Sequence, residues 1–204
     1  MKKNSNIKKY LQKTIFEKKN ILSQILVENE KIYKIIDMIS NSIKLDGKVL
    51  FCGNGGSASD SQHLATEFLV RLRPKISRSA IPALSLTLDN TYITACANDF
   101  GYEKVFSRSL ESFGKSRDIL IVISTSGNSK NVIEVLRKAK KMKIFSIGFL
   151  GSGGGRAKKL CNISIIIKSK KVARIQEAHI FLGHIILEGV ENILLTSKFI
   201  RRIK

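Results

Sequence analysis

The stretch "DILIVISTSGNSKNVIEVLRKAKKMK" (residues 118–143) contains, one after the other, the two patterns that decide the fold. Its first half is a run of Ile, Leu and Val, which is typical of a strand buried on both faces of a sheet. Its second half repeats apolar residues at three- and four-residue steps, with Lys and Arg between them, which predicts an amphipathic helix. A buried strand followed directly by such a helix indicates a parallel sheet covered by helices.

The same alternation continues on both sides of this stretch. Short apolar runs predict four further strands, at "KVLFCG", "IPALSLTL", "IFSIGFL" and "ISIIIK". Other segments predict helices over residues 57–70, 90–97, 103–113 and 172–195. We therefore predict an α/β fold: a doubly wound, parallel, five-stranded sheet with flavodoxin-like strand order, flanked by helices.

Residues 5–46 also predict helix, because Ile, Leu and Tyr recur at three- and four-residue steps up to Gly47. The sheet does not need this region to close. A helix of that length usually packs on partners, so we expect an oligomer. The predicted organisation is an N-terminal helical region, residues 1–46, that packs on partner subunits, followed by one structural unit, residues 47–204.

Composition narrows the class of protein. The chain has 204 residues, of which 43% are hydrophobic, and this suits one domain with a real core. No run approaches the roughly 20 apolar residues of a membrane span, and no signal-peptide core follows the basic N-terminus. The three cysteines, Cys52, Cys96 and Cys161, lack metal-ligand spacing, so we expect a reduced, cytoplasmic protein with no membrane partner.

The formal charge of +20 raises the question of an acidic partner such as nucleic acid. The Lys and Arg residues, however, are spread along the whole chain, and neither a nucleic-acid motif nor a row of aromatic residues accompanies them. The densest run, "RKAKKMK", falls at the end of a predicted helix, where cations favour the helix dipole. We therefore interpret the charge as a solvated surface and do not expect nucleic acid as the main partner.

Three loops follow predicted strands: "GNGGS" (residues 53–57), "STSGNS" (residues 124–129) and "GSGGG" (residues 151–155). Ligands of doubly wound folds bind at the edge of the sheet formed by the carboxyl ends of the strands, where these loops are expected. With Ala58, the first loop matches a permissive dinucleotide pattern, but no acidic-ended second strand follows at the required distance. The Gly-Lys-Ser/Thr signature of a P-loop is absent.

The loop "STSGNS" opens a predicted helix, where backbone N–H groups are free and the dipole is positive. Its hydroxyl groups suit a phosphate bound without a metal or a lysine. The alternative is helix capping by Ser126, Asn128 or Ser129. One cap explains one such residue and not all of them, so phosphate binding is the favoured interpretation.

Two pairs of polar residues share helix faces. His63 and Glu67 are four positions apart on one helix, and Gln176 and His184 are eight positions apart on the last one. Each residue alone is most simply a satisfied polar side chain. The chain has only three histidines, however, and two of them lie in segments that could line one cleft with a carboxylate nearby.

The two polar loops together resemble a sugar isomerase (SIS) domain, which binds phosphosugars. The match becomes closer over four motifs, which resemble the phosphoheptose isomerase (sedoheptulose 7-phosphate isomerase) family in order and spacing across residues 10–196: "GNGGSASDSQHLATEF", "DNTYITACANDFGYEKVFSR", "STSGNSKNVI" and "ARIQEAHIFLGHII". The resemblance implies an isomerase that converts sedoheptulose 7-phosphate to D-glycero-D-manno-heptose 7-phosphate. This is the first step toward the ADP-heptose of lipopolysaccharide.

The resemblance also implies roles for individual residues. Glu67 matches the family's carboxylate base, and His184 matches its partner acid/base. Zn²⁺ would be bound at positions matching His63, Glu67, Gln176 and His184, although Gln is an uncommon zinc ligand. If Glu67 binds the ion, its role as a free base must be reconsidered, because the ion could then polarise the carbonyl. The remaining implied contacts to the sugar phosphate are Asn54, Gly55, Gly56, Ser57, Asn98, Asp99, Ser124, Thr125, Ser126 and Ser129, together with Glu67 and Gln176.

One departure from the family and one geometric consequence follow. Some relatives carry Asp where this chain has Ala173. Any role of that Asp is therefore absent here or is taken by another carboxylate such as Asp60. Gln176 and His184 are separated by about 12 Å along one helix, whereas zinc bonds are only about 2 Å long. We therefore expect each active site to take Gln176 and His184 from different subunits of the family's homotetramer.

A function of another class is also compatible with the domain. Non-enzymatic SIS relatives bind the replication initiator DnaA and share "ARIQE" and a similar glycine loop. We expect those relatives to lack the His/Glu pair and the late histidine. This chain keeps His63, Glu67 and His184, which favours the enzyme.

Overall fold

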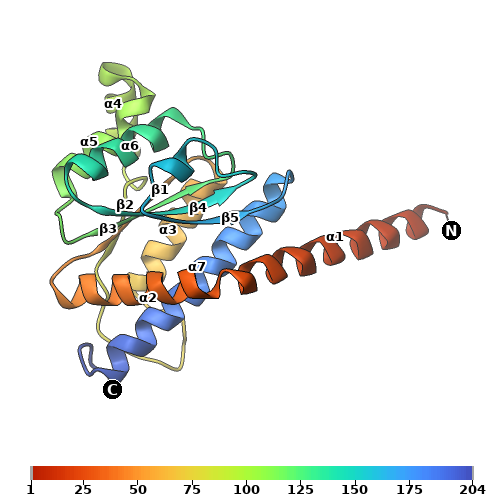
Figure 1. Ribbon diagram of the computed structural model, residues 1–204, viewed down its shortest axis with the longest axis horizontal. Coiled ribbons are helices and arrows are strands. Elements are labelled where there is room, and N and C mark those ends of the chain that lie inside the picture. Colours follow the sequence, from red (N-terminus) through yellow and green to blue (C-terminus); the bar gives the residue numbers. More distant parts are fainter. Residues whose placement is uncertain (1, 204) are drawn as a thin grey trace.

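Five parallel strands form the centre of the computed structural model, which describes residues 2–203 (Figure 1). Their order is β2-β1-β3-β4-β5, and every neighbouring pair is parallel. This confirms the predicted fold class and the flavodoxin-like order. The strands are β1 Val49–Gly53, β2 Ala83–Ser85, β3 Ile119–Ser124, β4 Phe145–Gly151 and β5 Ile163–Ile167.

Seven α-helices surround the sheet within the described residues, with two short 3-10 turns between them. The helices are α1 Lys2–Val27, α2 Asn29–Lys44, α3 Gly56–Leu69, α4 Asn90–Phe100, α5 Val105–Phe113, α6 Lys130–Lys141 and α7 Val172–Thr196. The 3-10 turns are η1 Tyr102–Lys104 and η2 Ala157–Lys159.

The structure differs from the sequence-based expectation in two places. The predicted N-terminal helix is two helices, because Glu28 leaves helical geometry with φ −91° and ψ 16°. The predicted strand "IPALSLTL" is ordered as a strand over only three residues. Pro82 precedes it and has no N–H to donate to a neighbouring strand, so pairing begins at Ala83.

The helices form two layers, one on each face of the sheet (Figure 1). Alternate strand residues such as Phe51 and Ile121 pack with α2, α3 and α7 on one face. The intervening residues, such as Leu50 and Val122, pack with α4, α5 and α6 on the other. Both faces of the central strands are therefore buried, which explains their continuous runs of apolar residues.

α3 and α7 lie side by side on the same face of the sheet, and their spacing decides where the polar residues meet. A Cβ atom built on Gly183 of α7 would lie 2.5 Å from both methyl carbons of Leu64 on α3. The absence of a side chain at Gly183 therefore allows the two helices to approach closely. His184, the next residue, is held beside α3 as a result.

α7 is the one helix among residues 2–203 that is long and apolar enough, by length and composition, to cross a membrane. Half of its most apolar segment is buried within the fold, and its buried residues include His179 and Glu191. Its position in the core accounts for its composition.

α1 extends away from the sheet and its covering helices (Figure 1). Its C-terminal half is anchored by buried Ile21 and Ile25. Its earlier turns expose large apolar side chains, including Tyr10, Ile15 and Phe16. α2, in contrast, packs on α7 within the chain, with Ile35 and Ile39 fully buried.

Candidate active site

The loops after β1 and β3 lie next to each other at the carboxyl edge of the sheet. Gly53 pairs with Ile123 in the parallel register, so Asn54 and Ser124, the residues that follow them, are neighbours. The side-chain amides of Asn54 and Asn131 exchange two hydrogen bonds of 2.8 Å, and Asn131 is buried on α6. The loop "GNGGS" is therefore fixed to the helix that "STSGNS" opens.

The N-termini of α3 and α6 both lack a side-chain cap. The N-cap residue of α3 is Gly55, with φ 56° and ψ −123°. The N-cap residue of α6 is Ser129, whose hydroxyl caps no backbone N–H. Some first-turn N–H groups are already used within the chain, since Ser57 donates to Asn54 O and Val132 donates to Asn131 Oδ1. The positive ends of two adjacent helix dipoles are nevertheless suited to an anion. The capping alternative therefore does not account for Ser129, and phosphate binding remains favoured.

The other hydroxyl groups of "STSGNS" shape the loop itself. The buried Ser124 Oγ accepts a bond of 3.0 Å from the Gly127 N–H, and Ser126 Oγ accepts one of 3.2 Å from the Asn128 N–H. Both contacts tighten the turn and use the N–H groups of Gly127 and Asn128 within the loop. Ser57, in the first turn of α3, is buried as well.

The third loop, "GSGGG", supports the second loop. The Ala157 N–H donates to Gly127 O at 2.9 Å, and the Arg156 N–H donates to Asn128 Oδ1 at 3.0 Å. A Cβ atom built on Gly127 would lie 2.0 Å from Gly154 O, and Gly127 has φ 64°. Only glycine is compatible with that position.

Gln176 lies over the first residue of α3. A Cβ atom built on Gly56 would lie 2.3 Å from Gln176 Nε2. The side-chain amide therefore lies next to the loop "GNGGS". The glycine at position 56 makes room for it.

His63, Glu67 and His184 gather further along the same two helices. His63 Nε2 is 3.1 Å from His184 Nε2 and 3.5 Å from Glu67 Oε1. The two imidazole rings are tilted by 53° with centroids 5.2 Å apart. His63 is exposed, whereas Glu67 and His184 are half-buried. A cluster of two imidazoles and a carboxylate is thus formed within one chain, across more than a hundred residues of sequence.

Burial lowers the pKa of His184, and the neighbouring His63 lowers it further, while Glu67 and Glu188 oppose the shift. His184 is therefore neutral at pH 7 and can accept a proton or bind a metal ion. Burial also raises the pKa of Asp60 to about 6, partly offset by His63. The Oδ2 atom of Asp60 is buried and has no hydrogen-bond partner among the described residues.

Not all of the predicted residues come together. Gln176 and His184 lie at different levels of α7, the first beside Gly56 and the second beside His63. Asn98 and Asp99 are exposed on α4, and the recorded bond of the Asn98 amide is to Asp99 at 2.9 Å. Across residues 2–203, no group of three or more His, Cys, Asp or Glu side chains is placed so that it could hold a metal ion. Within one chain, His63, Glu67 and His184 therefore do not make up a metal site.

The structure adds residues that the sequence reasoning missed. The Tyr102 hydroxyl donates to Asn54 Oδ1 at 3.0 Å. A cleft of about 330 Å³ next to the loops is lined by Asn54, Tyr102, Glu103, Ser129, Lys130 and Asn131. The sequence signal for Tyr102 was its place in the motif "DNTYITACANDFGYEKVFSR", directly after Gly101. In the structure Gly101 has φ 85°. A larger cavity, of about 860 Å³, lies over α5 and α6 and contains none of the predicted site residues.

Comparisons with known proteins point to one family. The family profile described as "SIS domain" matches residues 15–151. The phosphoheptose isomerase of Clostridium acetobutylicum is 46% identical over 169 residues, which cover 83% of this chain and 85% of that protein. The phosphoheptose isomerase of Leptospira biflexa is 41% identical over 192 residues, covering 94% and 97%. The solved structure of phosphoheptose isomerase from Neisseria gonorrhoeae superimposes with a TM-score of 0.82 at 31% identity, covering 93% and 98%.

Proposed function

Because the chain belongs to the phosphoheptose isomerase family of SIS-domain proteins, we propose that it converts D-sedoheptulose 7-phosphate to D-glycero-D-manno-heptose 7-phosphate. The product would supply ADP-heptose for lipopolysaccharide, and the enzyme would work in the cytoplasm. The observation that carries the proposal is the coexistence, in one fold, of two uncapped helix N-termini and a carboxylate–imidazole cluster. The first suits a phosphate and the second suits proton transfer.

The phosphate would be bound by the loops "GNGGS" and "STSGNS". The Ser129 hydroxyl caps no backbone N–H, and the two loops lie next to each other at the positive ends of the α3 and α6 dipoles. Gln176 would contact the sugar near Gly56, and the Asn54–Tyr102–Asn131 network would hold the first loop in shape. We also propose that Asn98 and Asp99 contact the substrate, and this rests on the family resemblance.

The isomerisation moves one proton between neighbouring carbons. Glu67 would take the proton from C1 of the ketose. The electron pair would form the C1–C2 double bond, and the C2 carbonyl oxygen would take up a proton to give an enediol. A proton then arrives at C2, and C1 becomes the aldehyde carbon. His184, kept neutral by its lowered pKa, would exchange protons with the substrate oxygens.

Zinc is the metal that family resemblance suggests, and the cluster has suitable donor atoms. Tetrahedral zinc, with bonds of about 2.0–2.2 Å, holds neighbouring ligand atoms roughly 3.3–3.5 Å apart. The distances of 3.1 Å and 3.5 Å from His63 Nε2 to His184 Nε2 and to Glu67 Oε1 are close to this spacing. We propose that His63, Glu67 and His184 can instead bind one Zn²⁺ with Gln176, in which case Glu67 and His184 are ligands and are not free to exchange protons. When bound, the ion would act as a Lewis acid toward the substrate carbonyl.

The fourth ligand would come from another subunit. Within one chain Gln176 lies beside Gly56, about 12 Å along α7 from His184. We therefore propose a homotetramer in which each site combines His184 of one subunit with Gln176 of a neighbour. The exposed apolar side chains of α1, in the N-terminal region 1–46, would be covered in that assembly.

A coupled assay with sedoheptulose 7-phosphate tests the function. Glu67→Gln keeps the size of the side chain but removes the base, so we expect turnover to fall by about 10³-fold. Glu111→Gln makes the same change of charge on α5, on the opposite face of the sheet, and should retain wild-type turnover. An unchanged rate in Glu67→Gln contradicts the assigned role. Stable DnaA binding by a wild-type chain without turnover supports the binding-protein alternative.

A further inference from the structure

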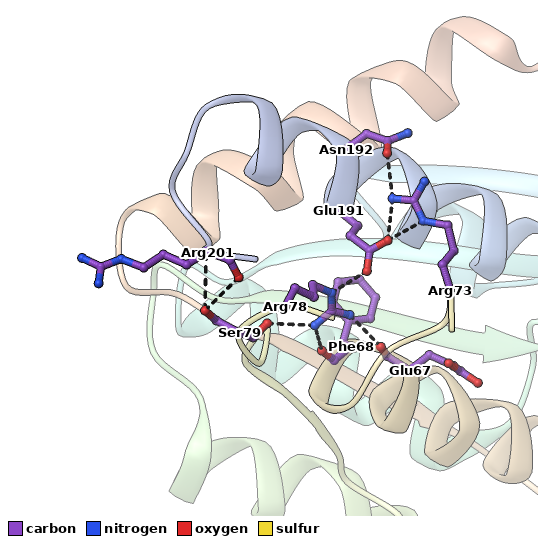
Figure 2. A network of polar contacts seen from close by, with 8 residues as sticks. All are labelled: Glu67, Phe68, Arg73, Arg78, Ser79, Glu191, Asn192 and Arg201. Carbon is purple, nitrogen blue, oxygen red and sulfur yellow. Dashed lines mark hydrogen bonds and ion pairs between the residues drawn. The ribbon is translucent and has the colours of Figure 1, made fainter. Parts of the chain in front are cut away.

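A buried ionic cluster lies at the far end of α3 and α7 from the phosphate-binding loops (Figure 2). Its acid is Glu191 on α7, which is fully buried. Arg78 Nε donates to Glu191 Oε1 at 2.5 Å, and Arg73 Nε donates to Oε2 at 2.5 Å. Both arginines come from the loop between α3 and β2, and the Arg78 side chain is also fully buried.

Arg78 uses its remaining nitrogens on the backbone of α3. Nη2 donates to the carbonyl of Glu67 at 2.9 Å, and Nη1 donates to the carbonyl of Phe68 at 2.9 Å (Figure 2). The last carbonyls of a helix have no partner within the helix. The guanidinium group therefore caps α3 at the residue that carries the proposed base.

The other side of the cluster is connected to the proposed acid/base. Glu191 follows His184 by about two helical turns on α7, so the two side chains lie on nearly the same face. One guanidinium group thus joins the main chain of Glu67 to the helix that carries His184. The Leu64–Gly183 contact gives these helices a second fixed point, next to His63 and His184.

The loop that carries Arg78 is itself held. The Ser79 N–H donates to Arg201 O, and the Ile203 N–H donates to Ser77 O, both at 3.0 Å. These bonds form a short antiparallel bridge between Arg78 and Arg202. The guanidinium group is therefore fixed from the loop side as well as from the helix side.

Stability alone is a weak explanation for this cluster. The desolvation of a buried ion pair can cancel its attraction, and apolar replacements of similar size are often neutral or stabilising. An ion pair gives something that apolar side chains do not, namely directional bonds to chosen atoms. Here those atoms include the carbonyl of Glu67.

We propose that Arg78 and Glu191 form a positioning pair that sets the carboxylate of Glu67 relative to His184. The proposal rests on the proposed function of Glu67 and His184, and it assigns neither Arg78 nor Glu191 a contact with substrate. A displacement of about 1 Å at a catalytic group can cost up to 10²-fold in rate. The phosphate-binding loops lie at the opposite ends of the same helices and would be unaffected.

Two lysine variants test the pair. Arg78→Lys keeps the charge but loses the fork that reaches the α3 carbonyls, so we expect kcat to fall by roughly 10- to 100-fold. KM should stay within about threefold, because phosphate binding is remote. Arg73→Lys makes the same change at the other oxygen of Glu191 without touching α3, and should keep kcat within about threefold. Equal losses of kcat in the two variants would overturn the proposal.

A double variant separates position from stability. In Arg78→Met/Glu191→Leu both charges are replaced by apolar side chains, so no unpaired charge is left buried and the protein should still fold. We expect kcat to remain at least tenfold low, because the carbonyl of Glu67 has lost its donor. A double variant with wild-type stability and wild-type kcat would refute a positioning role. This test can be made even if Arg78→Lys does not fold.

Hydrogen exchange provides a readout that does not need turnover. Amides of the last turn of α3 should exchange faster in Arg78→Lys and at the wild-type rate in Arg73→Lys. If the wild type does not isomerise the sugar but this contrast is found, the anchoring stands and the proposed function fails. If both lysine variants exchange like wild type, the anchoring itself is wrong.

Discussion

A methyl group added at Gly56 would lie 2.3 Å from the amide nitrogen of Gln176. Gly56 is the first residue of α3, and its φ is not positive, so alanine is compatible with its backbone. We expect Gly56→Ala to keep the wild-type melting temperature, because Gln176 can move aside. The displaced amide should raise KM for the sugar phosphate about tenfold. Steady-state kinetics and a thermal melt measure the two effects, and an unchanged KM would contradict the role of Gln176.

Gly55 provides the matched comparison one position earlier. No atom lies within 4 Å of a Cβ built there, but the residue has φ 56° and ψ −123°. Alanine at this position would be strained by roughly 1–3 kcal/mol. Gly55→Ala should therefore lower the melting temperature, in contrast to Gly56→Ala.

The lowered pKa of His184 gives a prediction about pH. If His184 acts in its neutral form, the acidic limb of kcat/KM should lie below 6.5, the ordinary pKa of histidine. Glu188 raises the pKa of His184, so Glu188→Gln should lower it and move this limb to a still lower pH. The profile of kcat/KM from pH 4.5 to 8 measures the shift, with Glu111→Gln as the control for net charge. If the acidic limb of Glu188→Gln moved to higher pH, the group that titrates there would not be His184.

At the scale of single elements, His179 on α7 makes stability depend on pH. It is fully buried against Phe149, and neither ring nitrogen has a hydrogen-bond partner within residues 2–203. Burial lowers its pKa to about 4 from an ordinary 6.5. As the pH falls, the unfolded chain binds a proton at His179 at a higher pH than the folded protein does. The contribution of neutral His179 to the free energy of unfolding is therefore complete above pH 6.5 and is lost as the pH falls toward 4. The loss amounts to about 3 kcal/mol.

Replacing His179 by a residue that does not titrate should remove its contribution to the pH dependence of stability. We expect His179→Leu, which is similar in size and favours helix, to flatten the fall in stability between pH 7 and pH 4.5. Urea midpoints at several pH values measure it. A variant that loses stability with pH as steeply as the wild type would show that other groups cause the effect.

The elements themselves were largely predictable from sequence, because each strand is a run of Ile, Val, Leu or Phe and each helix has a periodic apolar face. The exceptions have local causes. β2 begins only at Ala83 because Pro82 removes a donor, and it ends at Ser85, where the Ser85 hydroxyl accepts the Thr87 N–H. The break at Glu28 involves a single residue without Gly or Pro. A one-residue break leaves no periodic signal in the sequence.

The candidate site could be proposed from sequence motifs, but its layout could not. Motifs pointed to His63, Glu67 and His184, and the structure brings these three together. The cluster of Glu191 with Arg78 was not anticipated, because its members are more than a hundred positions apart and lie outside the motifs. Such pairs follow from tertiary packing of α3 on α7, which periodicity within one element does not report.

At the scale of the whole molecule, the proposed sharing of sites predicts complementation. Gln176→Ala and His184→Ala proteins should each be inactive. If subunits mix at random, a site that takes these residues from different chains is intact in about a quarter of cases. Mixed and re-associated variants should therefore recover about a quarter of wild-type turnover.

The control for this experiment is the double variant Gln176→Ala/His184→Ala. When it is mixed with either single variant, no intact shared site can form, so activity should not recover. An absence of recovery in mixtures of the two single variants, with hybrid oligomers verified by native mass spectrometry, would argue that each site belongs to one chain.

The alignment of α3 with α7 also has an evolutionary consequence. Gly56 faces Gln176, Leu64 faces Gly183 and His63 faces His184, so the two helices match one another nearly residue for residue. Inserting one residue inside either helix would turn everything beyond it by about 100° and shift it by about 1.5 Å. Substitutions can accumulate on the outer faces of these helices, but their lengths between the paired positions cannot drift. Insertions and deletions should therefore fall outside the segments between these paired positions.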